Sequence, residues 1–118
     1  NGLNLEENML PYTVAEKILP CLIYCSIQPQ ETNVYIQFDN PRLIVKEANI
    51  VNDFKSLFLP DDISIEISSD FKTASWKKLI ESACIGALQC KYNAPSIIFR
   101  NNAVLDECKK LINIMLPP

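Results

Sequence analysis

The stretch from Asp70 to Leu88, DFKTASWKKLIESACIGAL, places the strongest constraint on the fold of this chain. Serines 68 and 69 and Asp70 supply N-cap side chains, so the sequence predicts a long helix over residues 71–89. At about 100° per residue, Lys78 and Ser82 lie about 40° apart, and Gly86 lies about 80° from Lys78. The other helix faces are expected to pack as core through Trp76, Leu79, Ile80, Ala83 and Ala87.

This stripe of one lysine and two small residues has two interpretations. Small side chains beside an ammonium leave room for a ligand to approach it. They also allow two helices to pack closely, and most lysines, including the neighbouring Lys77, are ordinary solvated charges. The stripe by itself does not decide between a site and a packing surface.

The rest of the chain predicts an α/β region followed by an α region. The expected elements before the long helix are a helix, three strands, a helix and a strand, over residues 4–10, 18–27, 34–38, 42–45, 48–59 and 63–67. A final helix is expected over residues 103–115. The apolar strand 18–27 is expected at the centre of a sheet, buried on both faces. Residues 28–33 are predicted to form a turn, and strand 42–45 is expected to run antiparallel to the strand before it.

Composition excludes several functions. The net charge of −3 argues against nucleic acid or an anionic membrane as the main partner, and no apolar run reaches the ~18–20 residues of a membrane span. The absence of histidine removes Ser-His-Asp and Cys-His catalysis and most zinc sites. Five cysteines without a C-x-x-C pair indicate reduced thiols and no metal site. With two glycines only, Gly2 and Gly86, the chain contains no G-x-G-x-x-G loop for a dinucleotide.

The long-helix segment also carries a recognisable frame, D-x-x-x-A-x-W-x-K-L, made by Asp70, Ala74, Trp76, Lys78 and Leu79. This frame resembles the start of the C-terminal domain of the ketopantoate reductase (2-dehydropantoate 2-reductase) family. Two further segments resemble the family in the same order. Asn1-Gly2 followed by Glu6-Glu7 is similar to its Q-N-G-x-x-x-E-E stretch, and residues 18–26 with 42–45 are similar to its V-L-x-G and R-[LI]-x-x-G strands. Together these segments cover most of residues 1–90.

The resemblance implies a fragment that crosses a domain boundary. Residues 1–67 would be the end of a Rossmann-type nucleotide-binding domain. Residues 68–118 would be the first helices of an all-helical C-terminal domain for substrate binding and dimerisation. The implied parent protein is a cytoplasmic NADPH-dependent reductase of a 2-keto acid in pantothenate biosynthesis, with homo-oligomerisation left open. The fragment alone is expected to be inactive, because the residues that mainly bind NADPH are absent from it.

The resemblance also assigns roles to three residues. Lys78 is implied to be the general acid, which stabilises and protonates the ketone oxygen as hydride reaches the carbon. Asn1 is implied to orient both the nicotinamide and the substrate, and Ser82 to bind the substrate. Pantoate-forming members commonly carry asparagines where this chain has Ser82 and Gly86. Two alternatives therefore stay open, namely a related hydroxy-acid reductase or dehydrogenase with another substrate, and a non-catalytic interaction module.

Overall fold

The structure is a computed structural model that describes residues 3–116. It has mixed α and β structure, with a small sheet region followed by a helical region. The chain divides into two compact units, Asn1–Ser75 and Trp76–Pro118. Among the described residues, no helix combines the length and the apolar character needed to cross a bilayer.

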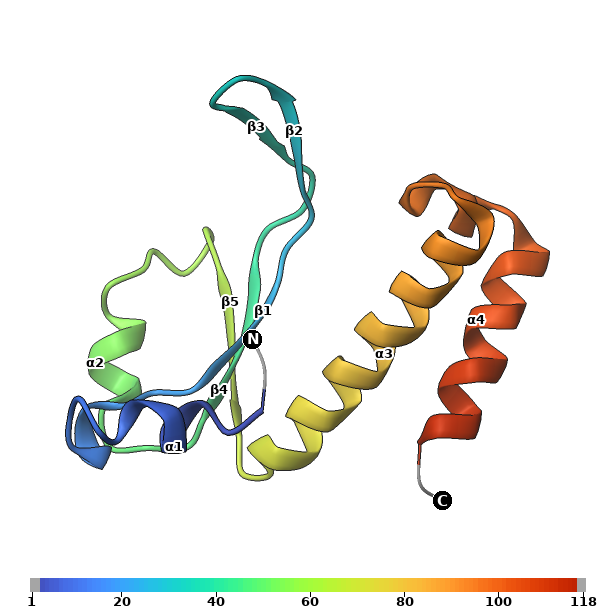
Figure 1. The fold of residues 1–118 in the computed structure, drawn as a ribbon. Helices are drawn as coiled ribbons and strands as arrows, with labels where there is room; N and C mark the ends of the chain where they lie inside the picture. Colours follow the sequence, from blue (N-terminus) through green and yellow to red (C-terminus); the bar gives the residue numbers. More distant parts are fainter. Residues whose placement is uncertain (1–2, 117–118) are drawn as a thin grey trace. The chain divides into compact units, whose positions relative to one another are not determined.

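The first unit is organised around a three-stranded sheet (Figure 1). The strand order is β1 (Cys21–Tyr24), β4 (Arg42–Lys46) and β5 (Ser64–Ser68), with β4 in the centre. Strand β4 runs antiparallel to β1, with Leu22 opposite Ile44, and parallel to β5. The structure therefore confirms the strands expected near residues 42–45 and 63–67, but β4 pairs with β1 and β5 and not with the strand before it in the sequence.

The buried central strand is β4, and not the segment 18–27 that the sequence indicated. Leu43, Ile44 and Val45 are consecutive and all buried, which requires cover on both faces of β4. The core of this unit joins Leu43 and Val45 to Val51 of helix α2 (Val51–Lys55). Residues 43–45 form a short apolar run without a proline, whereas the longer run 18–27 contains Pro20, which cannot donate a hydrogen bond in a central strand.

Strand β1 is shorter than predicted and is buried on one face only. It begins after Pro20, whose nitrogen has no hydrogen to donate to a ladder. Leu22 is 1% exposed, whereas its neighbour Ile23 is 47% exposed. Among the described strands, β1 pairs with β4 alone, so it lies at an edge of the sheet.

A separate two-stranded hairpin occupies the segment where a turn was predicted. Strands β2 (Ile27–Glu31) and β3 (Val34–Gln37) pair antiparallel and extend from the sheet region (Figure 1). The turn is confined to two residues, of which Asn33 has a φ of 65°, the left-handed conformation that asparagine tolerates. The expected pairing of strand 34–38 with strand 42–45 is therefore wrong, because β3 pairs with β2.

Helix α2 is also shorter than the predicted helix 48–59. Val51 and Phe54 face the core, and Phe58 packs edge-on against Phe54 with ring centroids 5.2 Å apart. The Ser56 hydroxyl donates to the Asp53 carbonyl (2.7 Å) at the point where the helix ends. The apolar spacing continues beyond the end of α2 because Phe58, in the turn that follows the helix, packs against Phe54.

Helix α3 (Phe71–Tyr92) begins at the end of the first unit and continues into the second, which also contains a 3₁₀ turn η2 (Ser96–Arg100) and helix α4 (Asn102–Met115). The predicted long and final helices are confirmed. The Asp70 carboxylate accepts from the Thr73 amide (3.2 Å) at the start of α3, and Asn93, with a φ of 47°, follows its end. At the start of α4, the Asn101 side chain accepts from the Ala103 amide (2.9 Å).

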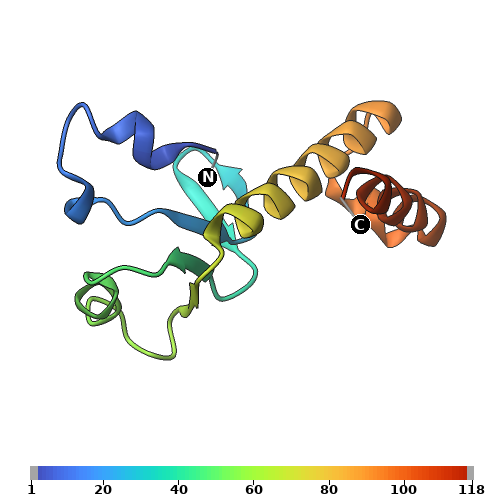
Figure 2. The ribbon, with the colours of Figure 1, turned by 90° about the horizontal axis from the view of Figure 1, so that it is seen from below.

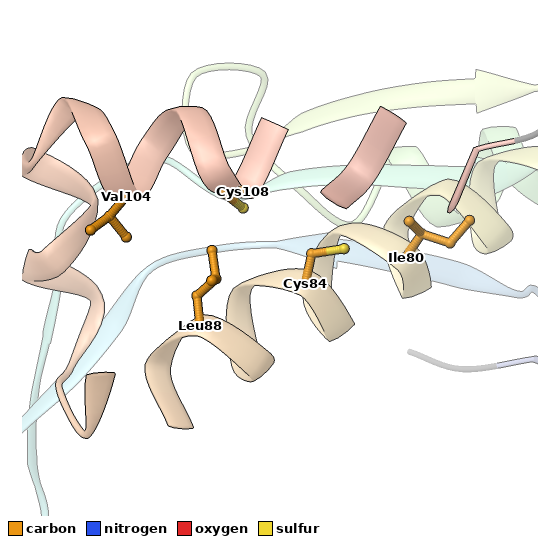
Figure 3. Packing of buried hydrophobic residues seen from close by; sticks show 5 residues of the cluster. All are labelled: Ile80, Cys84, Leu88, Val104 and Cys108. Atoms are coloured by element: carbon orange, nitrogen blue, oxygen red, sulfur yellow. The ribbon is translucent and has the colours of Figure 1, made fainter. Parts of the chain in front are cut away.

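Helices α3 and α4 lie side by side in both views of the ribbon (Figures 1 and 2). Their buried contact is shown in Figure 3, where side chains of the two helices enter one shared space. The cluster consists of Ile80, Cys84 and Leu88 from α3 and Val104 and Cys108 from α4. Spacings of four residues place each set along one stripe of its helix.

The expected core of α3 is right at Ile80 and wrong at the other four positions. Trp76 is 46% exposed and Leu79 is 41% exposed, and Ala83 and Ala87 are exposed as well. The physical reason is that α4 covers only one stripe of α3 in the described structure. An apolar residue beside that stripe stays at the surface.

A polar cluster joins the C-terminal end of α3 to α4. The Glu107 carboxylate accepts from Lys91 (2.5 Å) and from the Tyr92 hydroxyl (2.6 Å). These two donors, with Lys91 the larger contributor, lower the pKa of Glu107 from its ordinary value. The same hydrogen bond from Lys91 to Glu107 has the opposite effect on the cation, because it raises the pKa of Lys91 from its ordinary value.

The alternation of β1 predicts a large difference between two adjacent substitutions. Leu22→Ala removes a fully buried side chain and is expected to lower the free energy of unfolding by about 2–5 kcal/mol. Ile23→Ala, the matched control, is expected to cost less than about 1 kcal/mol because Ile23 is half exposed. Urea denaturation followed by circular dichroism measures both values. Equal losses would show that β1 is covered on both faces, as the sequence alone suggested.

The Glu107 cluster predicts an acid-dependent loss of stability. A carboxylate with a lowered folded pKa stabilises the folded state above its ordinary pKa, and this contribution is lost as the pH falls through the folded pKa. The wild-type chain is therefore expected to lose stability below about pH 4 more steeply than Glu107→Gln.

The measurement for this prediction is the thermal midpoint of the helical signal between neutral and acid pH. Glu81→Gln, which changes an exposed carboxylate of α3, serves as the control. Parallel pH profiles for the wild type and Glu107→Gln would contradict the stabilising role of the cluster.

Candidate functional site on helix α3

Lys78 lies in an ordered part of α3. The helix start is capped by Asp70, and the buried Ser75 hydroxyl donates to the Phe71 carbonyl (2.8 Å) one turn earlier. Lys78 is half-buried, whereas the neighbouring Lys77 is exposed. The difference follows from helix geometry, because successive residues point about 100° apart.

Ser82 follows Lys78 by four residues and is exposed. The helical rise places it about 6 Å further along the axis, on nearly the same face. Gly86 continues the stripe, and an added Cβ at Gly86 would have no atom within 4 Å apart from those of its two chain neighbours and of the local helix backbone. The small residues of the stripe therefore face open space within the described structure, and they do not pack against a neighbouring helix there.

Of the three site residues that the resemblance assigns, the structure brings two onto one face. Lys78 and Ser82 share a side of α3. Asn1 lies outside the described residues, so its predicted role in binding substrate and cofactor has no structural description. The catalytic and binding roles of all three residues stay predictions.

Two residues of the same face were not singled out from the sequence. Ile85 and Gln89 follow Lys78 by seven and eleven residues, which places each about 20° from its direction. Ile85 is 39% exposed, and the Gln89 side-chain amide donates to the Ser96 hydroxyl (3.0 Å). Counting residues at i+4, i+7 and i+11 from Lys78 would have found both.

Other features of the described structure do not contain the predicted site residues. Residues 3–116 hold no group of three or more His, Cys, Asp or Glu that could bind a metal ion. No disulfide joins any of the five cysteines, all of which lie within residues 3–116. A groove of about 680 Å³ in the first unit is lined by side chains between α2 and β5, including Lys55, Phe58 and Ile65, and by none of Lys78, Ser82 or Gly86.

The chemistry of the Lys78 face is that of a cation beside a hydroxyl. An ammonium stabilises negative charge that develops on an oxygen atom and can donate a proton to it. A serine hydroxyl one turn away can donate to, or accept from, a second polar group of the same ligand. An exposed isoleucine further along adds an apolar contact. This combination can hold an anionic or polar group beside an apolar one.

The open space at Gly86 predicts a stabilising substitution. Glycine in a helix interior is destabilising by about 0.5–1 kcal/mol relative to alanine. Gly86→Ala is therefore expected to raise the free energy of unfolding of the helical unit by this amount, and Ala83→Gly, the reciprocal control, to lower it similarly. Thermal unfolding followed at 222 nm measures both. A loss of stability in Gly86→Ala would mean that the position is closely packed.

Comparison with known proteins places these observations in a family context. The chain matches no family model. Two curated relatives, both named 2-dehydropantoate 2-reductase, come from Mycobacterium tuberculosis strains CDC 1551 and H37Rv. Each is 24% identical over 86 residues, which is 73% of this chain and 29% of the relative. The chain thus spans less than a third of the length of the curated relatives that it matches.

The fold of this chain is also similar to that of a solved structure. It is a dimeric ketopantoate reductase from Staphylococcus aureus, with a TM-score of 0.59 and 21% sequence identity. The match covers 80% of this chain and 35% of that chain, and at this identity it bears on the fold alone. Together, the curated relatives and the structural neighbour support the chain as a fragment of the ketopantoate reductase family.

Proposed function

We propose that this chain is part of an NADPH-dependent reductase of a 2-keto acid, of the 2-dehydropantoate 2-reductase type, in which Lys78 is the general acid. The observation that carries the proposal is the half-buried Lys78 on the capped helix α3, in a chain whose relatives are named 2-dehydropantoate 2-reductase. Pantothenate biosynthesis is the corresponding pathway.

The proposed step uses the ammonium of Lys78 in two ways. It attracts the carbonyl oxygen of the keto acid, and it donates a proton to that oxygen as negative charge develops there. Ser82 would hold a second polar group of the substrate through its hydroxyl. NADPH supplies the hydride when bound. The chain has only the glycines Gly2 and Gly86, so it lacks a phosphate-binding loop, and residues outside this chain would hold most of the cofactor.

The fold of the first unit supports a Rossmann-type domain end over residues 1–67. Strands β4 and β5 are parallel neighbours, and helix α2 lies between them in the sequence. This β-helix-β connection is the unit from which nucleotide-binding α/β domains are built. Residues 68–118 would then begin the helical C-terminal domain, with Asn1 near the nicotinamide and the substrate.

The setting of the proposed enzyme is the cytoplasm, where cysteines that form no disulfide remain reduced. The dimeric state of the structural neighbour supports a homo-oligomer as its assembly.

The role of Lys78 is tested in the full-length protein that contains this chain. Lys78→Met is expected to lower kcat for keto-acid reduction by about 10²–10⁴-fold, because it removes the proton donor while keeping the aliphatic stem. Lys77→Met, the matched control, removes an exposed charge at the next position and is expected to leave kcat nearly unchanged. NADPH oxidation at 340 nm measures both variants.

A loss of less than about tenfold in Lys78→Met would contradict the general-acid role. The 118-residue chain alone is expected neither to bind NADPH in a fluorescence titration nor to oxidise it. If none of the 2-keto acids tested supports NADPH oxidation by the full-length protein, the alternative of a non-catalytic interaction module replaces the reductase.

A second candidate is a reductase or dehydrogenase of a different hydroxy acid. The observation that favours it is the open space at Gly86, beside the exposed Ile85 and two turns beyond Lys78. An asparagine side chain at this position would fill that space with a polar group for a hydroxylated substrate. Glycine leaves this space open for a bulkier hydrocarbon group of the substrate.

A substrate panel distinguishes the two candidates. If Gly86 admits a larger group, the full-length protein is expected to show a higher kcat/KM for 2-keto acids with bulky apolar substituents than for ketopantoate, by about tenfold or more. Ser82→Asn combined with Gly86→Asn is expected to shift this ratio toward ketopantoate. Preference of the unmodified protein for ketopantoate would eliminate the second candidate and leave the first intact.

A further inference from the structure

We draw no further inference here: the strongest candidate, the exposed apolar face of helix α3 formed by Trp76, Leu79, Ala83 and Ala87, carries nothing because the described structure does not show what covers it.

Discussion

The contact between α3 and α4 is the interaction on which the candidate site depends. Ile80, Cys84 and Leu88 bury one stripe of α3 against Val104 and Cys108, and this burial sets the rotation of α3 about its own axis. Most of the stability of a helix in a protein comes from such packing of one face, and little comes from helix propensity. Once that stripe is placed, the direction of every other residue of α3 follows from helix geometry.

Hydrogen bonds at the two ends of α3, and a sulfur contact in its middle, complement this packing. At the start, Asp70 accepts from the Thr73 amide and satisfies one of the first free backbone donors. Near the end, Lys91 and Tyr92 both donate to Glu107 of α4. The Cys84 thiol also contacts the Met115 sulfur (3.7 Å), which joins the last turn of α4 to the middle of α3. The helix is thus held at its N-terminal cap, in its middle and near its C-terminus.

Local signals predicted the helices of this chain better than its strands. The N-cap at Asp70 and the breaker Asn93-Ala94-Pro95 bracket α3 closely, because caps and prolines act on neighbouring backbone atoms. Strand pairing depends on residues far apart in sequence, so the pattern in residues 18–27 did not reveal that β4 takes the central place. The hairpin was missed because Gln28 and Pro29 look like turn residues, yet both pair with β3.

The candidate site was predictable to the extent that it lies on one helix. The spacing of Lys78 and Ser82 is sufficient to place both on one side of α3. Asn1 lies outside the described residues, and helix periodicity contains no information about where a residue so distant in sequence lies relative to Lys78. The periodicity also did not show which apolar stripe of α3 is buried, because α3 is apolar on more than one side.

The buried stripe and the Lys78 face belong to the same rigid rod, and this links core packing to chemistry. A side-chain tip about 6 Å from the helix axis moves about 1 Å when the helix turns by about 10°. Misplacement of about 1 Å at a reacting group can lower a rate by about a hundredfold. A conservative change of volume at Leu88 or Cys108 would therefore displace the amine of Lys78 by rotating α3. For Lys78, the proposed proton donor, the packing of α3 against α4 sets the direction of the side chain.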